Sequence, residues 1–380
     1  MAFEPTYQGA RIVAPAVEEH FARHFAEAQG RHETEIAPKP DREAIERMID
    51  TAFWASLRKE EGYSPKISLA FLPPEKAKLS ITFDQRMPLT AKGITKLAPA
   101  VERPGIHLGV WQDKEGIHLW GATRDLPPVC FVVEVVEPGM LVVKHRKIHG
   151  FGKFFNVAIL KGDQIKLVDE SKAKLSDSPA ILTSMLSFAP PPSWNVSINV
   201  LVQLAASMRA HGRGGILLVV PSGTDAWLDS LIQPIQYAVF PPDSSLAELM
   251  RLDLSHIDPL MWRGALNQAV NALAGLTAVD GATLINDKYE LLAFGAKIGR
   301  SDKGTRIERI VATEPVAGNT AEVLHPGQNG GTRHLSAAQF VHDQRDAIAL
   351  VASQDGKFTI FAWSEREGMV HAHRVDALLL

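Results

Sequence analysis

Hydrophobic side chains recur at helical spacing near the start of the chain. The positions concerned are Val17, Phe21 and Phe25, followed by Ile45, Ile49, Phe53 and Leu57. Apolar residues four positions apart lie on one face of a helix, so helices are predicted within residues 16–60. Asp41 precedes the second group and is its expected N-cap.

Between residues 67 and 170 the pattern changes to short apolar runs. The runs are IHLGVW, GIHLWGA, VCFVVEVV, MLVVKH, FFNVAIL and IKLVD. They are rich in β-branched and aromatic residues, and the Glu-Pro-Gly and Lys-Gly-Asp sequences between them are typical of turns. Residues 1–189 are therefore predicted to be an amino-terminal α+β module.

Two proline-rich breaks divide the middle of the chain. Phe188-Ala-Pro-Pro-Pro-Ser193 is predicted to be an extended spacer, because successive prolines exclude a helix. A helix over 196–210 and a buried strand over 216–220 are expected next, up to a second break at 240–245. We assign residues 190–247 to a linker and a sensor-like α/β segment, which can pack with the amino-terminal module.

The last segment, residues 248–380, alternates helices and strands. Asp258 and Pro259 are the expected N-cap and first residue of a helix that ends near Gly275. The elements expected after it are the hairpin ATLI and YELLAF, a strand near 307–313, a helix from about residue 333, and the strands DAIALVAS and KFTIFAW. This order predicts an α/β fold for this domain.

Composition and charge exclude several classes of protein. Apolar residues make up 46% of the chain, which excludes disorder as the dominant state. The 40 Lys and Arg residues nearly balance the 43 Asp and Glu residues, so we expect no nucleic-acid partner. Cys130 is the single cysteine, which excludes an intrachain disulfide and a multi-cysteine zinc site. Without a long uncharged apolar run, we expect no membrane partner and a soluble, cytoplasmic protein.

Asp280-Gly281-Ala282 lies between the predicted 259–275 helix and a strand. A carboxylate at the start of a strand can hold a magnesium-type ion, and glycine beside it lets the backbone approach a phosphate or a base. A turn aspartate without a ligand is the alternative for this tripeptide taken alone.

A second motif, Gly330-Gly331-Thr332-Arg333-His334, precedes a short predicted helix in which Thr332 is the candidate N-cap. Glycines before a helix present backbone N–H groups and the positive end of the helix dipole to an anion. Arg333 can add bidentate phosphate contacts, and His334 can add a further donor. A solvated start of a helix explains the same residues.

Together, and in this order, the two motifs resemble the diadenylate cyclase (DAC) domain, the nucleotide-binding domain first known from the DNA-integrity scanning protein DisA. That family carries Asp-Gly-Ala after a long helix and Gly-(Thr/Ala)-Arg-His-Arg at the start of a later one. Asp280-Gly281-Ala282 and Gly331-Thr332-Arg333-His334 match these motifs, and Ser353 ends the strand DAIALVAS. The resemblance covers roughly the last third of the chain.

The resemblance implies a mixed, twisted β-sheet flanked by helices and a set of residue roles. Asp280 would bind Mg²⁺ or Mn²⁺ and help to activate the ribose 3′-hydroxyl, with Arg333 and His334 as the other catalytic residues. The nucleotide would be bound by Gly281, Ala282, Gly331, Thr332, Arg333, His334 and Ser353. In the family two such domains face each other, each with one ATP, so a homo-oligomer is expected.

Two positions depart from the family pattern. The second arginine of the later motif is Leu335 here, and the family's Ser-Glu pair reads Ser353-Gln354. Loss of a cation beside a triphosphate costs orders of magnitude in rate. Three arginines from the preceding loop and strand are candidates to supply the missing positive charge, namely Arg300, Arg306 and Arg309.

The residues before this domain also resemble a known kind of module. His211-Gly-Arg-Gly-Gly215 and the strand after it resemble the amino-terminal, DACNV-type extensions ahead of some soluble DAC domains, which are thought to be sensors. The ligand of such a sensor is not readable from the sequence. The glycine-rich turn can form an anion-binding nest, or it can be a plain turn before a buried strand.

Three further groups of residues invite a functional interpretation. His20 and His24 are one helical turn apart, but no third metal ligand is nearby in the sequence. His371 and His373 lie on one face of a predicted strand, which is more often an exposed face than a metal pair. The basic run Lys144–Lys147 fits either a phosphate contact or a solvated turn.

The leading functional hypothesis is a soluble diadenylate cyclase that condenses two ATP molecules into cyclic di-AMP and pyrophosphate. The alternative is a catalytically weak or inactive sensor that binds ATP or cyclic di-AMP. An interaction scaffold that no longer binds nucleotide is a third possibility. Leu335 favours the second hypothesis, whereas Asp280, Arg333 and His334 favour the first.

Overall fold

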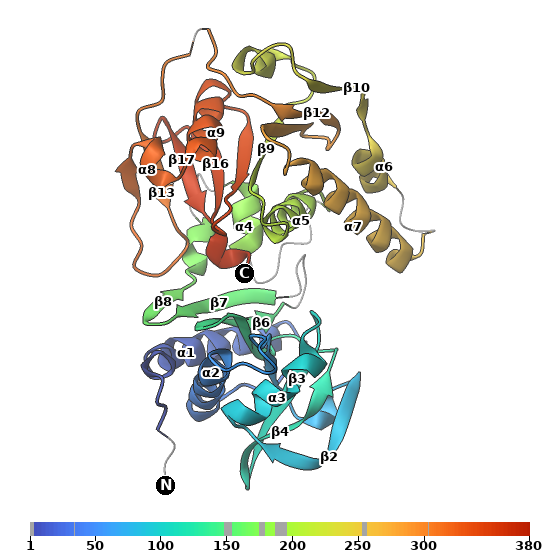
Figure 1. The fold of residues 1–380 in the computed structure, drawn as a ribbon, viewed down its shortest axis with the longest axis vertical. Helices are drawn as coiled ribbons and strands as arrows, with labels where there is room; N and C mark the ends of the chain where they lie inside the picture. Colours follow the sequence, from blue (N-terminus) through green and yellow to red (C-terminus); the bar gives the residue numbers. More distant parts are fainter. Residues whose placement is uncertain are drawn as a thin grey trace. The chain divides into compact units, whose positions relative to one another are not determined.

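The chain forms two compact units, Met1–Val168 together with Leu380, and Asp169–Leu379. The computed structural model describes residues 4–33, 35–147, 154–174, 179–186, 196–252, 257–302 and 304–380. The spacer expected at 188–193 lies outside these residues. The described residues form a mixed α and β fold with two mixed sheets (Figure 1).

The first unit contains one eight-stranded sheet and three helices among its described residues. Its helices are α1 (Gln8–Gly30), α2 (Arg42–Ser56) and α3 (Ala91–Val101), and its strands are β1 (Ser68–Phe71), β2 (Ser80–Pro88), β3 (His107–Asp113), β4 (Gly116–Thr123), β5 (Phe131–Glu137), β6 (Met140–Arg146), β7 (Phe154–Lys161) and β8 (Gln164–Leu167). The strand order is β2-β4-β3-β1-β5-β6-β7-β8, and only β1 and β3 pair in parallel.

The predicted amino-terminal helices form because their apolar faces pack on this sheet. α2 contacts β5 and β6, and α1 contacts α2 and β7. Phe21 and Ile45 are fully buried in these contacts. Asp41 is the N-cap of α2, as predicted, and its Oδ1 accepts a hydrogen bond of 2.8 Å from the Ala44 N–H. α2 ends at Ser56, so Leu57 follows the helix and is half exposed.

The second unit contains a nine-stranded sheet. Its helices are α4 (Ala180–Leu186), α5 (Val196–Ala210), α6 (Ser245–Arg251), α7 (Pro259–Leu276), α8 (Pro326–Asn329) and α9 (Thr332–Asp343). Its strands are β9 (Gly215–Val220), β10 (Tyr237–Asp243), β11 (Ala282–Asn286), β12 (Leu291–Ala296), β13 (Ile310–Thr313), β14 (Glu322–Leu324), β15 (Ile348–Ala352), β16 (Phe358–Ser364) and β17 (Met369–Arg374).

The strand order of this sheet is β10-β12-β11-β9-β15-β16-β17-β13-β14. β9 pairs in parallel with β11, and β17 pairs in parallel with β13, whereas the other neighbours are antiparallel. β9, β11 and β15 lie at the centre and are buried along almost their whole length. Their continuous apolar sequences reflect this burial on both faces.

Helices cover both faces of the central strands. α9 contacts β9, β15, β16 and β17 and lies across the sheet in Figure 1. Ile216 and Leu218 share one apolar cluster with Phe340 of α9. Because side chains alternate along a strand, the fully buried Leu217 points to the opposite face. α5 contacts β15 and α7, and it provides cover on that side.

The boundaries differ from the sequence prediction in two places. The second unit begins at Asp169 rather than at residue 248, because β9 has partners on both edges and cannot be separated from this sheet. The break expected at 240–245 is largely the end of β10. Prolines are tolerated there because β10 is an edge strand, and one of its sides needs no ladder hydrogen bonds. Within the described residues, no helix combines the length and the apolar character that a membrane span requires.

Candidate functional site

Segments far apart in the sequence meet at one end of the central strands in the second unit. Gly214 directly precedes β9, Asp280 and Gly281 precede β11, and Ser353 directly follows β15. β9 and β11 are parallel and β15 is antiparallel to β9, with Ala282 opposite Ile216 and Ala352 opposite Gly215. The register therefore brings Asp280 of the first motif and Ser353, at the end of the strand DAIALVAS, to the same end of the sheet.

Arg333 joins this group from the first turn of α9. A Cβ placed on Gly214 would lie 3.0 Å from Arg333 Nη1 and 3.2 Å from the Ala352 carbonyl oxygen. The guanidinium therefore rests against the loop before β9, in space that only a glycine at position 214 leaves open. The charge of Arg333 also contributes to the lowered pKa of Asp280, so two of the three predicted catalytic residues lie in one region of the structure.

Asp280 presents an ionised carboxylate to solvent. Its side chain is 88% exposed, and its Oδ2 lies 2.5 Å from Lys297 Nζ. The hydrogen bond and the charge of Lys297 lower the pKa of Asp280, with a smaller contribution from the charge of Arg333. The carboxylate is therefore charged at neutral pH and available to a cation.

Gly281 and Ala282 have a structural explanation within the fold. Gly281 has φ +120°, and a Cβ on it would lie 2.5 Å from the Gly295 carbonyl carbon and 2.8 Å from the Ala296 oxygen. Only glycine allows β12 to approach this closely. Ala282 pairs with Ala296, and its side chain is fully buried in the apolar cluster under α9. Both residues fix the position of the Asp280 backbone.

The start of α9 differs in detail from the prediction. Gly331 occupies the N-cap position, and Thr332 is the first helical residue rather than the cap. Gly331 and Thr332 are both exposed, so the positive end of a twelve-residue helix faces solvent beside Arg333. This end of α9 can attract an anion, as the motif predicts.

His334 does not point into solvent with its neighbours. Its side chain is only 3% exposed, and a Cβ on Gly330 would lie 2.4 Å from its Nδ1. Its ring meets Phe361 edge-on, with ring centroids 6.0 Å apart. Burial lowers the pKa of His334, against an opposing effect of Asp355, so the imidazole is neutral. The buried His334 ring therefore packs against Gly330 in the glycine-rich loop.

Ser353 lies in a tight turn after β15. Its N–H donates to the Lys357 carbonyl at 2.9 Å. Hydrogen bonds from Lys357 and Ser353 lower the pKa of Asp355 to about 2, so this second carboxylate of the region is ionised. Gln354, which stands where the family has glutamate, donates from Nε2 to the Arg213 carbonyl at 3.3 Å.

The loop His211–Gly215 belongs to this site. His211 Nε2 lies 3.1 Å from Thr277 Oγ1 at the end of α7, and a Cβ on Gly215 would lie 2.3 Å from the Thr277 carbonyl oxygen. Sequence reasoning assigned this loop to a separate sensor-like segment. The apolar run that follows this loop indicates that the loop belongs with the other motifs, because this run forms the central strand β9.

Leu335 lies at a hollow that also contains arginines. The hollow has a volume of about 220 Å³ and is lined by Ile298, Gly299, Arg300, Arg306, Leu335, Ser336 and Gln339. Leu335 packs partly against the apolar cluster of the second unit. Arg300 and Arg306 are exposed and line the same hollow, whereas Arg309 lines a neighbouring one. Two guanidinium groups thus stand near the position where the family has its second arginine.

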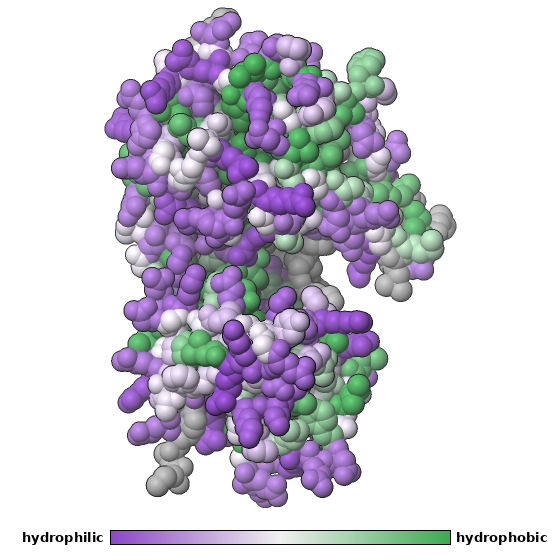
Figure 2. All heavy atoms as spheres, viewed as in Figure 1, coloured by the Kyte–Doolittle hydropathy of each residue, from purple (hydrophilic) through white to green (hydrophobic). Residues whose placement is uncertain are grey.

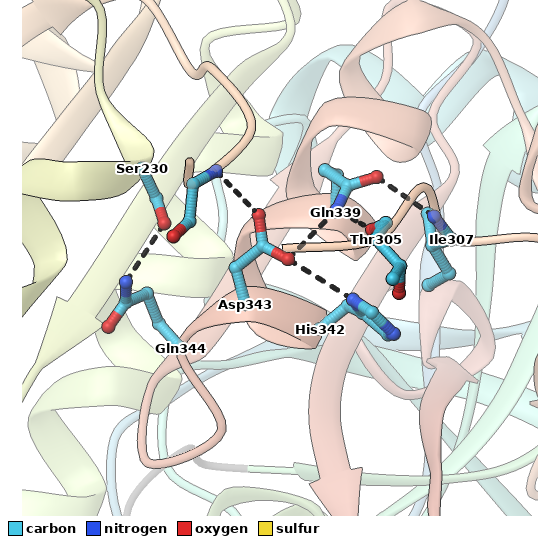
Figure 3. A network of polar contacts seen from close by, with 8 residues as sticks. Ser230, Thr305, Ile307, Gln339, His342, Asp343 and Gln344 are labelled. Atoms are coloured by element: carbon cyan, nitrogen blue, oxygen red, sulfur yellow. Dashed lines mark hydrogen bonds and ion pairs between the residues drawn. The ribbon is translucent and has the colours of Figure 1, made fainter. Parts of the chain in front are cut away.

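A buried carboxylate holds the loop that carries these arginines. Figure 3 shows Asp343, at the end of α9, at the centre of a polar network. Its Oδ2 accepts from the Ser301 N–H at 3.0 Å, and its Oδ1 accepts from Gln339 Nε2 at 3.0 Å. Gln339 in turn accepts from the Ile307 N–H at 3.0 Å. The loop is therefore fixed to α9 on both sides of Arg306.

The other groups singled out by the sequence have structural roles that the contacts define. His373 is buried rather than exposed, and its Nδ1 lies 2.9 Å from Thr313 Oγ1. It lines a cavity of about 320 Å³ together with His371. Lys144 forms an ion pair with Glu134 and lies 4.7 Å from the centre of the Phe154 ring. Lys144 and His145 are buried in β6, so this part of the basic run is not the solvated turn that was the alternative.

Comparison with known families identifies one part of the chain. Residues 34–124 match the family model of the probable sensor domain DACNV, a domain found alongside diadenylate cyclase domains. No curated protein matches the chain. The expected DACNV-type region is therefore present, but it lies in the first unit instead of the segment 190–247.

Proposed function

We propose that the second unit is a diadenylate cyclase-type nucleotidyltransferase and that the chain condenses two ATP molecules into cyclic di-AMP. The observation that carries the proposal is the meeting of Asp280, Arg333 and Ser353 at one end of β9, β11 and β15. An ionised carboxylate, a guanidinium and an exposed helix start are the groups that a metal-bound triphosphate requires. The DACNV match in the first unit supports the same assignment.

Asp280 is the residue proposed to hold Mg²⁺ or Mn²⁺. A single exposed carboxylate fits such an ion, because Mg²⁺ keeps several waters and takes its other ligands from phosphates. When bound, the ion neutralises phosphate charge. Lys297 pairs with Asp280 in the nucleotide-free chain, and this ammonium can turn to a phosphate when the ion takes the carboxylate.

Arg333 and the start of α9 are proposed to bind the triphosphate. Guanidinium groups bind phosphate through two parallel hydrogen bonds, and the helix start adds backbone donors from Gly331 and Thr332. His334 is proposed to act as a positioning residue, because its buried ring supports Gly330. Ser353 adds a hydroxyl at the edge of the same site.

The reaction requires two copies of the chain. Each 3′-hydroxyl attacks the α-phosphorus of the opposite ATP, a new P–O bond forms, and the bond to the β,γ-pyrophosphate breaks. Two pyrophosphates and two protons leave for each cyclic di-AMP. Positioning and charge neutralisation are the main catalytic demands.

A surface for the second copy is available at the edge of the sheet. β10 is an edge strand, and Phe240 is 96% exposed and Tyr237 41% exposed. Figure 2 shows apolar side chains over β10 and α6. Exposed apolar groups beside an unpaired edge are typical of association surfaces.

A nucleotide sensor without turnover is the second candidate. Leu335 packs against the apolar cluster, and Gln354 is bonded to a backbone carbonyl, so two positions that are charged in the family have neutral structural roles here. Such a protein would bind ATP or cyclic di-AMP and release no pyrophosphate.

Product analysis of the purified chain with ATP and Mn²⁺ separates the candidates. We expect cyclic di-AMP from the wild type, none from Asp280→Asn, and wild-type amounts from Asp346→Asn, a matched exposed carboxylate of the same unit. Asp280 is exposed, so its replacement should leave the melting temperature unchanged. Absence of product, with a rise in melting temperature on adding ATP that Arg333→Ala abolishes, would establish the sensor. Absence of both effects would refute both candidates.

A further inference from the structure

Three imidazoles converge inside the first unit. His20 and His24 lie one turn apart on α1, and His145 lies near the end of β6. The ring centroids are 4.3 Å apart for His20 and His24, and 5.2 Å apart for each of these rings and that of His145. One nitrogen from each ring lies within 4.8 Å of the other two. The sequence suggested only the pair on the helix, because His145 is remote in the chain.

The cluster is buried among aromatic side chains. The exposed fractions of His20, His24 and His145 are 7%, 1% and 0%. Phe155 stacks on the rings of His20 and His145, with centroids 5.9 and 5.4 Å away. Such surroundings exclude bulk water and fix the orientation of the rings.

Polar groups lie beside two of the three rings. His24 Nδ1 lies 3.2 Å from a Glu27 carboxylate oxygen, and His145 Nδ1 lies 3.1 Å from the Arg146 carbonyl oxygen. When His145 donates its Nδ1–H to this carbonyl, its Nε2 is the basic nitrogen. This is the arrangement that supports metal-binding histidines in proteins.

Burial favours the neutral form of two of the three rings. Burial, reinforced by the charge of His24, lowers the pKa of His145 to about 3. Burial and the neighbouring imidazoles also lower the pKa of His20, with a contribution from Arg23. Arg23 Nη2 lies 3.4 Å from His20 Nδ1. Neutral imidazole is the metal-binding form.

We propose that His20, His24 and His145 bind one divalent transition-metal ion of the zinc type. Three imidazole nitrogens favour Zn²⁺, Co²⁺, Ni²⁺ or Cu²⁺ over Mg²⁺ and Ca²⁺, which prefer oxygen. Zn–N bonds of about 2.0–2.1 Å place tetrahedral ligand atoms about 3.4 Å apart, so a separation within 4.8 Å closes by small side-chain rotations. A water or an exchangeable ligand takes the fourth position.

The ion would connect α1 to β6 within the compact unit that contains the DACNV match at residues 34–124. An ion that binds only the folded chain stabilises it by mass action. Metal occupancy would therefore raise the thermal stability of this unit. The proposal is independent of nucleotide chemistry in the second unit, because none of its residues belongs to that site.

The test uses the full chain stripped of metal with a chelator and then titrated with Zn²⁺ or Co²⁺. We expect one ion per chain and a rise of several degrees in the melting temperature of the first unit. Bound Co²⁺ should give tetrahedral absorption without the thiolate charge-transfer band that Cys130 would give. His24→Gln and His145→Asn should each abolish these effects. His32→Gln, which changes an exposed histidine just after α1, should retain them, and so should His371→Gln in the second unit.

Two results would overturn the proposal. The first is failure of the wild-type chain to take up Zn²⁺, Co²⁺, Ni²⁺ or Cu²⁺ at micromolar concentration, a measurement that does not depend on how the variants fold. The second is uptake that persists in folded His24→Gln and His145→Asn chains or disappears in His371→Gln. Circular dichroism of each metal-free variant shows whether it is folded.

Discussion

Replacing Gly281 by alanine is the sharpest test of how the predicted Asp-Gly-Ala motif is built. The residue has φ +120°, and its missing Cβ would lie 2.5 Å from the Gly295 carbonyl carbon. The neighbouring atoms belong to the backbone of β12, so no side-chain rotation relieves the overlap. A forbidden backbone conformation costs about 1–3 kcal/mol, and overpacking costs a similar amount.

We therefore expect Gly281→Ala to reduce the free energy of unfolding of the second unit by about 2–5 kcal/mol. For a unit of this size the melting temperature should fall by about 5–20 °C. Gly264→Ala is the matched control, because Gly264 lies in α7 with no atom within 4 Å of a built Cβ. That change should stabilise the unit by about 0.5–1 kcal/mol through helix propensity.

Urea unfolding of both variants and of the wild type measures these differences in the free energy of unfolding. Hydrogen exchange of residues 282–296 shows whether the loss of stability is located in β11 and β12. A Gly281→Ala chain within about 0.5 kcal/mol of the wild type would refute the argument, because surface substitutions fall in that range. Retained stability with lost ATP binding would show instead that Gly281 serves the nucleotide alone.

Two further predictions concern Leu335 and His373. If the second unit is a cyclase, Leu335→Arg should raise cyclic di-AMP formation about 10-fold or more over Leu335→Gln at saturating ATP, because a guanidinium stabilises transition-state charge; equal rates with intact ATP binding would contradict this. Burial lowers the pKa of His373 to about 3, so below its ordinary value near 6.5 the unfolded chain takes up a proton that the folded chain does not. The free energy of unfolding should therefore fall as the pH drops from 7 to 5, and His373 should contribute about 2 kcal/mol of this fall. In urea unfolding, His373→Gln should lose that part of the pH dependence. An unchanged pH dependence would exclude His373 as its source.

Local patterns in the sequence predicted most of the elements. The helix expected over 259–275 is α7, and the helix over 196–210 is α5. Helical periodicity and capping are encoded within a few residues, as the Asp41 side chain illustrates, so they are readable without the fold. The Asp-Gly-Ala and Gly-Thr-Arg-His motifs are readable for the same reason.

The sheet pairing was not readable in this way. The run Ile216–Val220 was recognised as a buried strand, but its partners β11 and β15 come from far along the chain. Strand pairing depends on contacts between remote segments, and a short apolar run fits many partners. The domain boundary predicted at residue 248 differs from the start of the second compact unit at Asp169 for this reason.

For this protein, the sequence by itself determined the local elements and the chemical character of the motif residues. Only the tertiary structure decided which of them meet. It brought Arg333 against Gly214, turned His334 under Gly330, and set His145 beside the two histidines of α1. Side-chain burial and proximity arise when remote segments pack, so these features follow from the folded chain and not from the spacing of its residues.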